Sequence, residues 1–286
     1  MPLITRFDPW QSSLCTCPPK LTLNPYTGCS HNCVYCYATG YTPHFAKCKP
    51  KKDLLKQVEA DAAKLRGETV SVSNSSDPYP HSEAELGLTR KCLEILSRSD
   101  CKVQLVTKSN LVTRDVDILC KLPCTVALTV TTVDEETAKL IEPQAPSPSE
   151  RLKAIEVLVD KGISVSVRVD PIIPHVNDNP AELIATLASL GVKHVTSSTY
   201  KVKRDNWLRF ASALPSIAEK LKPLYFQKGE RVGGSLMLPV DLRLKLMLNV
   251  RTLVVNCGMK FGVCRENLKQ LNTAACDGSW LLSKQR

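Results

Sequence analysis

The sequence predicts an α/β protein with a parallel sheet, followed by a helical, cysteine-containing C-terminal extension. Six short stretches rich in Val, Ile, Leu and Thr alternate with stretches of helical periodicity over residues 20–205. Gly, Pro and Asn separate these stretches, and beyond residue 205 two helical patterns follow each other with no strand pattern between them. Strands that alternate with helices form parallel sheets with right-handed crossovers.

The first half of this region holds three strand–helix units. A short strand at 20–24 is followed by a helix at 53–66, whose apolar residues recur at helical spacing until Gly67 ends it. The next two units, in order, are a strand at 69–73 with a helix at 83–97, and a strand at 102–107 with a helix through Val116, Leu119 and Leu122.

The second half repeats the alternation with clearer helix boundaries. Ser147 and Pro148, followed by Glu150, predict a capping box with proline at the first helical position, and Gly162 closes that helix. The other elements, in order, are strands at 125–131, 163–169 and 194–199 and a helix at 179–190.

The chain divides into three parts by pattern. Residues 1–19 form an N-terminal segment without periodicity, 20–205 hold the alternating units, and 206–286 form the extension, with helices expected at 206–222 and 241–256. Residues 257–286 contain cysteines but no convincing period.

Composition limits the function classes. A chain of 286 residues with 43% hydrophobic content buries one sizeable core. It has no apolar run long enough to span a membrane, and its start lacks the apolar stretch of a signal peptide, so we expect a cytoplasmic protein that does not bind membranes. Thirteen cysteines fit a reducing compartment as thiols or metal ligands, and the net charge of +10 is compatible with a polyanionic partner.

The stretch NPYTGCSHNCVYCYATGY carries the main chemical signal. Cys29, Cys33 and Cys36 are spaced Cys-x3-Cys-x2-Cys. A four-iron cluster normally takes four thiolates, so three of them leave one iron open to bind a cofactor. Two alternatives remain: the three cysteines are ligands of a zinc site, or they are buried structural thiols.

The spacing, the aromatic residue before the third cysteine and the early position resemble the radical S-adenosylmethionine (SAM) superfamily. In that superfamily the open iron binds the methionine end of SAM, and reductive cleavage yields a 5'-deoxyadenosyl radical. The resemblance implies a 4Fe-4S cluster, SAM, an external electron donor such as flavodoxin or ferredoxin, and a partial (β/α)6 TIM-type barrel.

Polar residues follow each predicted strand, and in parallel barrels such strand ends meet at one mouth. We expect Asp77 and Lys108 to bind the ammonium and carboxylate of SAM. Ser76 and Thr129 are expected to hydrogen-bond its amino group and ribose, and Arg168 is an alternative contact for the carboxylate or ribose.

Seven short motifs together resemble the spore photoproduct lyase-like family, whose members are often labelled DNA repair photolyases. These motifs are NPYTGC, YCYA, SDPY, VTKS, RD-x-D-x-L, IEPQAPSPSERL and DPIIPHVND. The resemblance covers about residues 14–205. It implies that Tyr35 and Tyr37 lie beside the cluster and SAM, and that Ser76, Asp77 and Lys108 contact SAM.

One position departs from that family. The true lyases carry a hydrogen-donating cysteine in a segment that reads Cys-Thr-Ser-Asp, and here the segment is Asn74-Ser75-Ser76-Asp77. Asparagine has no sulfur from which to donate a hydrogen atom, so the chain is not expected to be the true lyase.

The other cysteines leave two interpretations open. Cys257, Cys264 and Cys276, with Cys15 or Cys17, are candidates for a second cluster or a zinc site. Alternatively they are buried thiols, and Cys264 or Cys276 is a hydrogen donor at the mouth.

Two basic stretches suggest the substrate class. One follows the cluster motif and the other follows the sixth strand: Lys47, Lys49, Lys51 and Lys52 near His44 and Phe45, and Lys201, Lys203 and Arg204 near Trp207. A basic rim with aromatics can grip phosphates and stack a base. We expect a monomeric radical SAM enzyme that acts on DNA or RNA; a peptide or small metabolite as substrate, or a non-catalytic zinc and nucleic-acid-binding module, are the alternatives.

Overall fold

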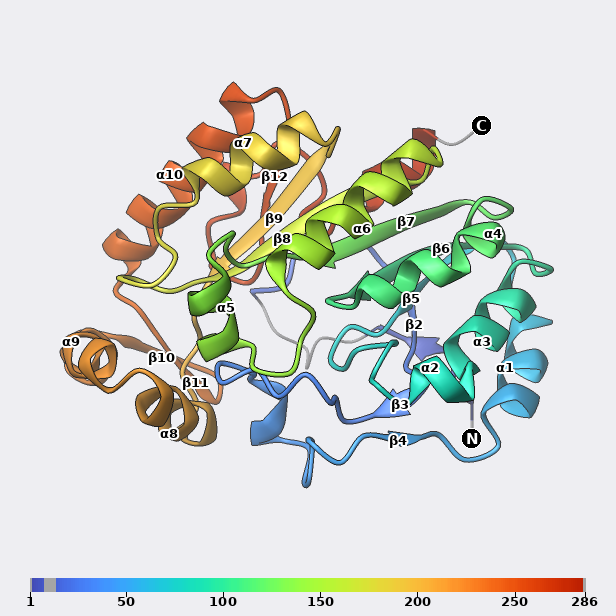
Figure 1. Cartoon of the computed structure of the whole chain (residues 1–286), viewed down its shortest axis with the longest axis horizontal. Coiled ribbons are helices and arrows are strands. Elements are labelled where there is room, and N and C mark those ends of the chain that lie inside the picture. Colours follow the sequence, from blue (N-terminus) through green and yellow to red (C-terminus); the bar gives the residue numbers. More distant parts are fainter. Residues whose placement is uncertain (1, 8–13, 285–286) are drawn as a thin grey trace.

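An eight-stranded sheet forms the centre of the molecule, in the order β1-β2-β5-β6-β7-β8-β9-β12. The computed structural model describes residues 2–7 and 14–284 (Figure 1). In this part of the chain β1 and β2 pair antiparallel, and the other neighbours in the sheet run parallel. The strands are β1 (Thr5–Arg6), β2 (Leu21–Leu23), β5 (Glu68–Val72), β6 (Cys101–Thr107), β7 (Cys124–Thr129), β8 (Ser164–Ile172), β9 (His194–Thr199) and β12 (Lys260–Val263).

Helices cover the outer face of the curved sheet, as Figure 1 shows for α3, α6, α7 and α10. The helices are α1 (Leu54–Ala62), α2 (Glu83–Leu86), α3 (Leu88–Leu96), α4 (Val116–Leu119), α5 (Glu135–Ile141), α6 (Pro148–Asp160), α7 (Ala181–Ser189), α8 (Arg204–Ala213), α9 (Pro215–Phe226) and α10 (Val240–Asn256). Short 3-10 turns are η1 (Ala38–Gly40), η2 (Asn110–Asp115), η3 (Lys269–Leu271) and η4 (Ser279–Lys284), and two small ribbons pair β3 (Tyr26–Thr27) with β4 (Lys49–Pro50) and β10 (Glu230–Val232) with β11 (Ser235–Met237).

Alternation along the strands separates an apolar layer from a polar interior. Val70 and Val72 of β5 are fully buried in the apolar core. Ser71 between them points the other way, and its hydroxyl lies 3.3 Å from Oε1 of Gln104 on β6. The concave side of the sheet therefore carries hydrogen-bonding side chains, and this is the side on which a polar ligand can be held.

The fold prediction is confirmed for the six strands from β2 to β9, and the structure adds a seventh parallel strand. β12 lies within the segment expected to be helical and pairs with β9, and α10 packs against both. Its four residues, with Gly262 among them, are too few to show a period in the sequence.

Two expected helices are each split. Gly87, with φ of +60°, separates α2 from α3 within 83–97. Pro215 begins α9, because the residue before a proline is disfavoured in helical geometry, so the helix expected at 206–222 breaks at Leu214. The capping box of Ser147 and Glu150 is confirmed.

The C-terminal segment returns across the interior of the sheet. A Cβ on Gly262 would lie 2.5 Å from Cα of Cys276, and a Cβ on Gly278 would lie 2.9 Å from Cβ of Ser166. Lys20, at the start of β2, forms a buried ion pair with Asp277 at 2.6 Å. These contacts place residues 276–278 at the floor of the interior.

Among the described helices, none is both long and apolar enough to cross a membrane.

Candidate functional site

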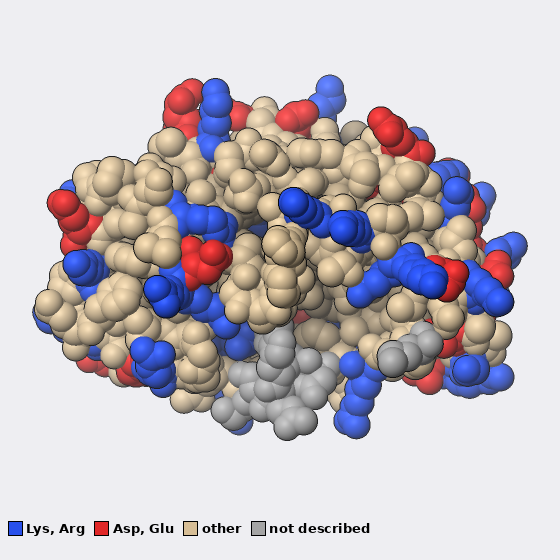
Figure 2. All heavy atoms as spheres, turned by 90° about the horizontal axis from the view of Figure 1, so that it is seen from below, with Lys and Arg blue, Asp and Glu red and all other residues tan. Residues whose placement is uncertain are grey.

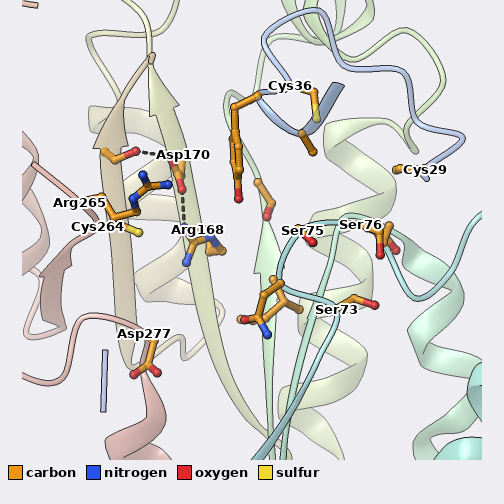
Figure 3. Close-up of a pocket in the computed structure, with 18 of the residues that line it drawn as sticks. Cys29, Cys36, Ser73, Ser75, Ser76, Arg168, Asp170, Cys264, Arg265 and Asp277 are labelled. Carbon is orange, nitrogen blue, oxygen red and sulfur yellow. Dashed lines mark hydrogen bonds and ion pairs between the residues drawn. The ribbon is translucent and has the colours of Figure 1, made fainter. Parts of the chain in front are cut away.

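A cavity of about 510 Å³ opens at the carboxyl ends of the parallel strands and reaches down to the floor. Figure 3 shows Arg168, Asp170, Cys264 and Arg265 on one wall and three serines that follow β5 on the other. Of the residues expected from the sequence to bind the cluster or SAM or to take part in catalysis, Cys276 does not line this cavity, and the others do: Cys29, Cys33, Cys36, Tyr35, Tyr37, Asn74, Ser76, Asp77, Lys108, Thr129, Arg168 and Cys264.

The three-cysteine loop is shaped by a tight turn at its start. Gly28 has φ of +86°, and a Cβ there would lie 2.3 Å from the carbonyl oxygen of Phe45. The amide of Cys29 donates to that same carbonyl at 2.9 Å. A residue other than glycine would push apart the two chain segments that fix Cys29.

An arginine from α8 holds the other end of the loop. Arg209 donates to the carbonyl oxygens of Cys33 (2.5 Å) and Cys36 (3.0 Å) and to Oγ1 of Thr39 (2.7 Å). Asp205, one turn earlier on the helix, pairs with the guanidinium at 3.1 Å. One side chain thus fixes the backbone of two of the three cysteines.

The three thiols suit a metal cluster by their chemical type. All are free and line one cavity. Burial raises the pKa of each, that of Cys33 to about 12, so they ionise at neutral pH when a metal cation stabilises the thiolates. Among the described residues no three His, Cys, Asp or Glu side chains stand together as a metal cage, and Figure 3 shows Cys29 apart from Cys36.

Unpaired polar atoms surround the upper part of the cavity. Oδ1 of Asn24, both ring nitrogens of His31, and the hydroxyls of Ser73 and Ser76 are buried without a hydrogen-bond partner. All four residues line the cavity. Unsatisfied buried polar groups are costly, so their concentration here fits a bound ligand rich in donors and acceptors, as an aminocarboxylate with a ribose is.

Asp77 has a larger structural role than the sequence indicates. Its carboxylate accepts hydrogen bonds from the amide of Tyr79 (2.9 Å), Oγ1 of Thr107 (2.7 Å) and the amide of Lys108 (2.7 Å). Nδ1 of His31 lies 3.5 Å away. Asp77 therefore joins the loops after β5 and β6, and its contact with the ammonium of SAM stays a prediction.

A buried ionic network lies beneath Tyr35. The Tyr35 hydroxyl donates to Glu142, which also pairs with Arg151 at 2.5 Å and lies 3.7 Å from Nζ of Lys108. Burial alone would raise the pKa of Glu142, but Arg151 and Lys108 outweigh it and lower the pKa to about 2. The amide of Val34 also donates to the carbonyl of Ile141, so the network supports the cysteine loop.

The opposite wall carries a second set of charges. Arg168 pairs with Asp170, whose other oxygen accepts from Ser198 at 2.5 Å, and the Arg168 guanidinium also hydrogen-bonds Cys264. Burial disfavours the charge on Asp170, but Arg168 outweighs it and lowers the pKa of Asp170. Nζ of Lys201 lies 2.6 Å from Glu266.

Two further predicted residues lie lower in the cavity or along its wall. Nδ2 of Asn74 donates to Thr22, and Oδ1 of Asn74 accepts from Ser71. Asn74 is therefore fixed toward the floor. The carbonyl of Thr129 accepts from Arg151 at 3.0 Å, and the residue lines the cavity.

The remaining cysteines do not come together in the set expected from the sequence, which was Cys257, Cys264 and Cys276 with Cys15 or Cys17. Cys257 is exposed at the end of α10, and Cys264 lies on the Arg168 wall. Cys15, Cys17 and Cys276 lie at the floor, where Sγ of Cys17 lies 3.7 Å from Sγ of Cys276. A second metal held by Cys257, Cys264 and Cys276 together is incompatible with this separation.

Sequence reasoning missed several residues that support the site. Glu142 and Arg151 stand inside a motif that the sequence analysis quoted, and a charged residue on the buried face of a helix was the available signal. Arg209 carried no such signal, because a half-exposed arginine on an amphipathic helix is ordinary. Tyr41, 40% exposed, also lines the cavity.

The chain is similar to proteins of bacteria and archaea. An uncharacterized protein of Mycobacterium tuberculosis (strain ATCC 25618 / H37Rv) is 27% identical over 233 residues, covering 73% of this chain and 68% of that protein. An uncharacterized protein of Methanocaldococcus jannaschii is 32% identical over 164 residues, covering 56% and 62%.

Among solved structures, a spore photoproduct lyase mutant with bound AdoMet and dinucleoside spore photoproduct matches with a TM-score of 0.69 at 17% identity, over 85% of this chain and 75% of that one. Streptococcus suis SuiB bound to S-adenosylmethionine matches with a TM-score of 0.54 at 14% identity, over 85% and 51%. These likenesses show the fold. The model of the Radical SAM superfamily matches residues 23–188, from β2 to α7, and this chain therefore belongs to the Radical SAM superfamily.

Proposed function

We propose that this radical SAM enzyme removes a hydrogen atom from a nucleic-acid substrate, in DNA repair or RNA modification. Superfamily membership implies a 4Fe-4S cluster and SAM. Cys29, Cys33 and Cys36 would hold the cluster, and the unpaired polar atoms of His31, Ser73 and Ser76 face the place for SAM. When bound, the two cofactors supply an organic radical that abstracts hydrogen.

The chain's own residues orient the reactants. Arg209 and Gly28 fix the ligand loop, and Asp77 fixes the two loops that would contact SAM. The walls enclose the centre of the cavity, which limits the access of water and other quenchers to a radical.

The observation that carries the nucleic-acid proposal is the positive charge around the cavity mouth. Figure 2, seen from below, shows Lys and Arg side chains gathered around the hollow. Lys47, Lys49 and Lys52 are exposed on the loop that follows the cluster motif, and Lys51 is half-buried there. With a net charge of +10, such a rim favours a polyanion.

Tyr41 is the aromatic side chain best placed to stack a base. It is 40% exposed, lines the cavity, and lies 5.8 Å from Nζ of Lys203, measured from the ring centre. Phe45 is buried, and Trp207 packs against Phe226 with ring centres 5.0 Å apart, so these two stabilise the fold.

The cavity dimensions limit how a nucleic acid can enter. At about 510 Å³ it does not admit a duplex, so a target base must be single-stranded or flipped out of its stack. The spore photoproduct lyase structure of similar fold holds a dinucleoside photoproduct, which is a substrate of this size class.

Binding tests the proposal first. We expect the anaerobic holoenzyme to bind fluorescent single-stranded RNA or DNA, with an affinity that falls as salt rises. Replacing four lysines of the rim by alanine should reduce the slope of log K against log salt by about 3, at roughly 0.7 per phosphate contact on a single strand. The rim set is Lys47, Lys49, Lys51 and Lys52. The matched control set, on or just after the outer helices, is Lys91, Lys121, Lys153 and Lys161.

Turnover tests it second. Formation of 5'-deoxyadenosine with dithionite and SAM should rise when tRNA or ultraviolet-irradiated DNA is added. If neither nucleic acid changes the rate, and the rim and control variants bind equally, a peptide or small metabolite is the substrate instead.

A further inference from the structure

Three thiols meet at the floor of the cavity. Sγ of Cys17 lies 3.7 Å from Sγ of Cys276, and Oγ1 of Thr16 donates to Sγ of Cys276 at 3.4 Å. The thiol of Cys15 lies near that of Cys17. Cys17 thus interacts with the thiol of Cys15, on its own segment, and with that of Cys276, about 260 residues away.

Long-range contacts build this arrangement. Lys20 pairs with Asp277 at 2.6 Å, and Nε2 of Gln104 donates to the carbonyl of Asp277 at 2.6 Å. Thr196 donates to the carbonyl of Cys276 at 2.7 Å. Cys276 and the neighbouring Asp277 are therefore tied to Lys20, next to β2, and to strands β6 and β9.

Two of the three thiols of the floor border the cavity. Cys15 and Cys17 line the same cavity as the cluster cysteines, and Cys276 lies directly behind Cys17. Oε1 of Gln104 lies 3.3 Å from Oγ of Ser71, which donates to Asn74, so one polar network joins the floor to Asn74.

The thiols of Cys15 and Cys17 hold their protons. The hydrogen bond to Cys17, and then burial, raises the pKa of Cys15. For Cys17 the bond to Cys15 lowers the pKa, but the bond to Cys276 and burial outweigh it and raise the pKa overall. A thiol that stays protonated retains the S–H bond from which a hydrogen atom can be given.

We propose that Cys17, positioned by Cys276, donates a hydrogen atom to carbon radicals formed in the cavity. The proposal rests on the radical chemistry of the proposed function and not on the substrate's identity. The S–H bond of Cys17 breaks, a C–H bond forms, and the unpaired electron moves from carbon to sulfur. The Cys17 thiol is restored by one electron from a low-potential one-electron reductant and one proton from solvent.

Cys264 is the rival donor, because it also lines the cavity and hydrogen-bonds Arg168. A cation lies near each of the two sulfurs, Arg168 beside Cys264 and Lys20 beside Cys17, but Cys17 also neighbours two further thiols. The test below separates the two.

The experiment uses the reconstituted holoenzyme in D₂O with dithionite and SAM, without nucleic acid or added thiol. Thiol hydrogens exchange with solvent and carbon-bound hydrogens do not, so donation by a thiol places deuterium in 5'-deoxyadenosine. The variants are Cys17→Ser, Cys276→Ser, Cys264→Ser and, as an exposed bystander, Cys120→Ser. Mass spectrometry reads the label, and a nitrone spin trap locates thiyl adducts on peptides.

We expect one deuterium per 5'-deoxyadenosine in the wild type and in Cys120→Ser, loss of the label in Cys17→Ser, and partial loss in Cys276→Ser. The trap should mark Cys17 or Cys276. An unchanged label in Cys17→Ser with an intact cluster spectrum, or an adduct confined to Cys264, overturns the proposal. Neither result bears on whether nucleic acid is the substrate, which the binding and turnover measurements decide.

Discussion

Replacing Arg151 by methionine should destabilise the protein strongly, because it leaves a carboxylate buried without its main partner. Arg151 and Glu142 are 1% and 2% exposed, and their side chains meet at 2.5 Å. Arg151 also donates to the carbonyls of Pro146 (2.8 Å) and Thr129 (3.0 Å), which lose their donors in the variant. Only Lys108 and the Tyr35 hydroxyl then remain near the Glu142 carboxylate.

The loss of folding stability expected for Arg151→Met follows in two ways that agree in magnitude. Breaking a buried ion pair by removing one partner costs about 3–5 kcal/mol. The partners of Glu142 outweigh its burial and lower its pKa from the usual 4.5 to about 2, which corresponds to about 3 kcal/mol of favourable interaction at neutral pH. Because Lys108 persists, we expect a loss of about 3 kcal/mol for Arg151→Met.

The assay is anaerobic urea unfolding of the apo-protein, followed by far-ultraviolet circular dichroism, for wild type, Arg151→Met, Glu142→Gln and the double variant. The double variant should be more stable than Arg151→Met by about 1–2 kcal/mol, because glutamine removes the uncompensated charge. A folded-state pKa below the unfolded value gives stability that is present above pH 4.5 and is lost as pH falls toward 2, so the difference between wild type and Arg151→Met should shrink on acidification. A loss below about 1 kcal/mol, or a double variant no more stable than Arg151→Met, would refute the reasoning.

Three other measurements test separate parts of the structure. Arg209→Gln removes charge-assisted hydrogen bonds to the backbone carbonyls of Cys33 and Cys36, each worth about 1.5–3 kcal/mol. Iron content after reconstitution should therefore fall in Arg209→Gln and recover partly in Arg209→Lys. Equal iron content in the wild type and both variants would contradict the role of Arg209 in fixing the cysteine loop. His194 accepts a hydrogen bond at Nδ1 from Trp280, and burial lowers the pKa of His194 to about 4. About 3 kcal/mol of folding stability should therefore be present above pH 6.5 and lost as pH falls through 4. An NMR titration of His194 with its midpoint near 6.5 would contradict this. Gly262→Ala, whose Cβ would lie 2.5 Å from Cα of Cys276, should lower stability by about 1–3 kcal/mol in thermal melts, and an unchanged melting temperature would show that the C-terminal segment yields freely.

The sequence by itself determined the alternating architecture and the cysteine loop. Strands such as 102–107 and helices such as that opened by Ser147 show their burial pattern in consecutive residues, and Cys29, Cys33 and Cys36 act together through their spacing on one loop. The strand-end rule also placed Asn74, Lys108 and Arg168 at one cavity, because carboxyl ends of parallel strands must converge.

Only the tertiary structure decided which side chains meet across long separations. The Arg209 clamp and the contact of Cys17 with Cys276 join residues whose local sequence indicates no partner. β12 likewise became a strand because β9 offered a free edge to four residues too short to show a period. Periodicity records which face of an element is buried, but it does not record what that face is buried against, and the contacts of Cys276 and Asp277 at the floor of this cavity are of that kind.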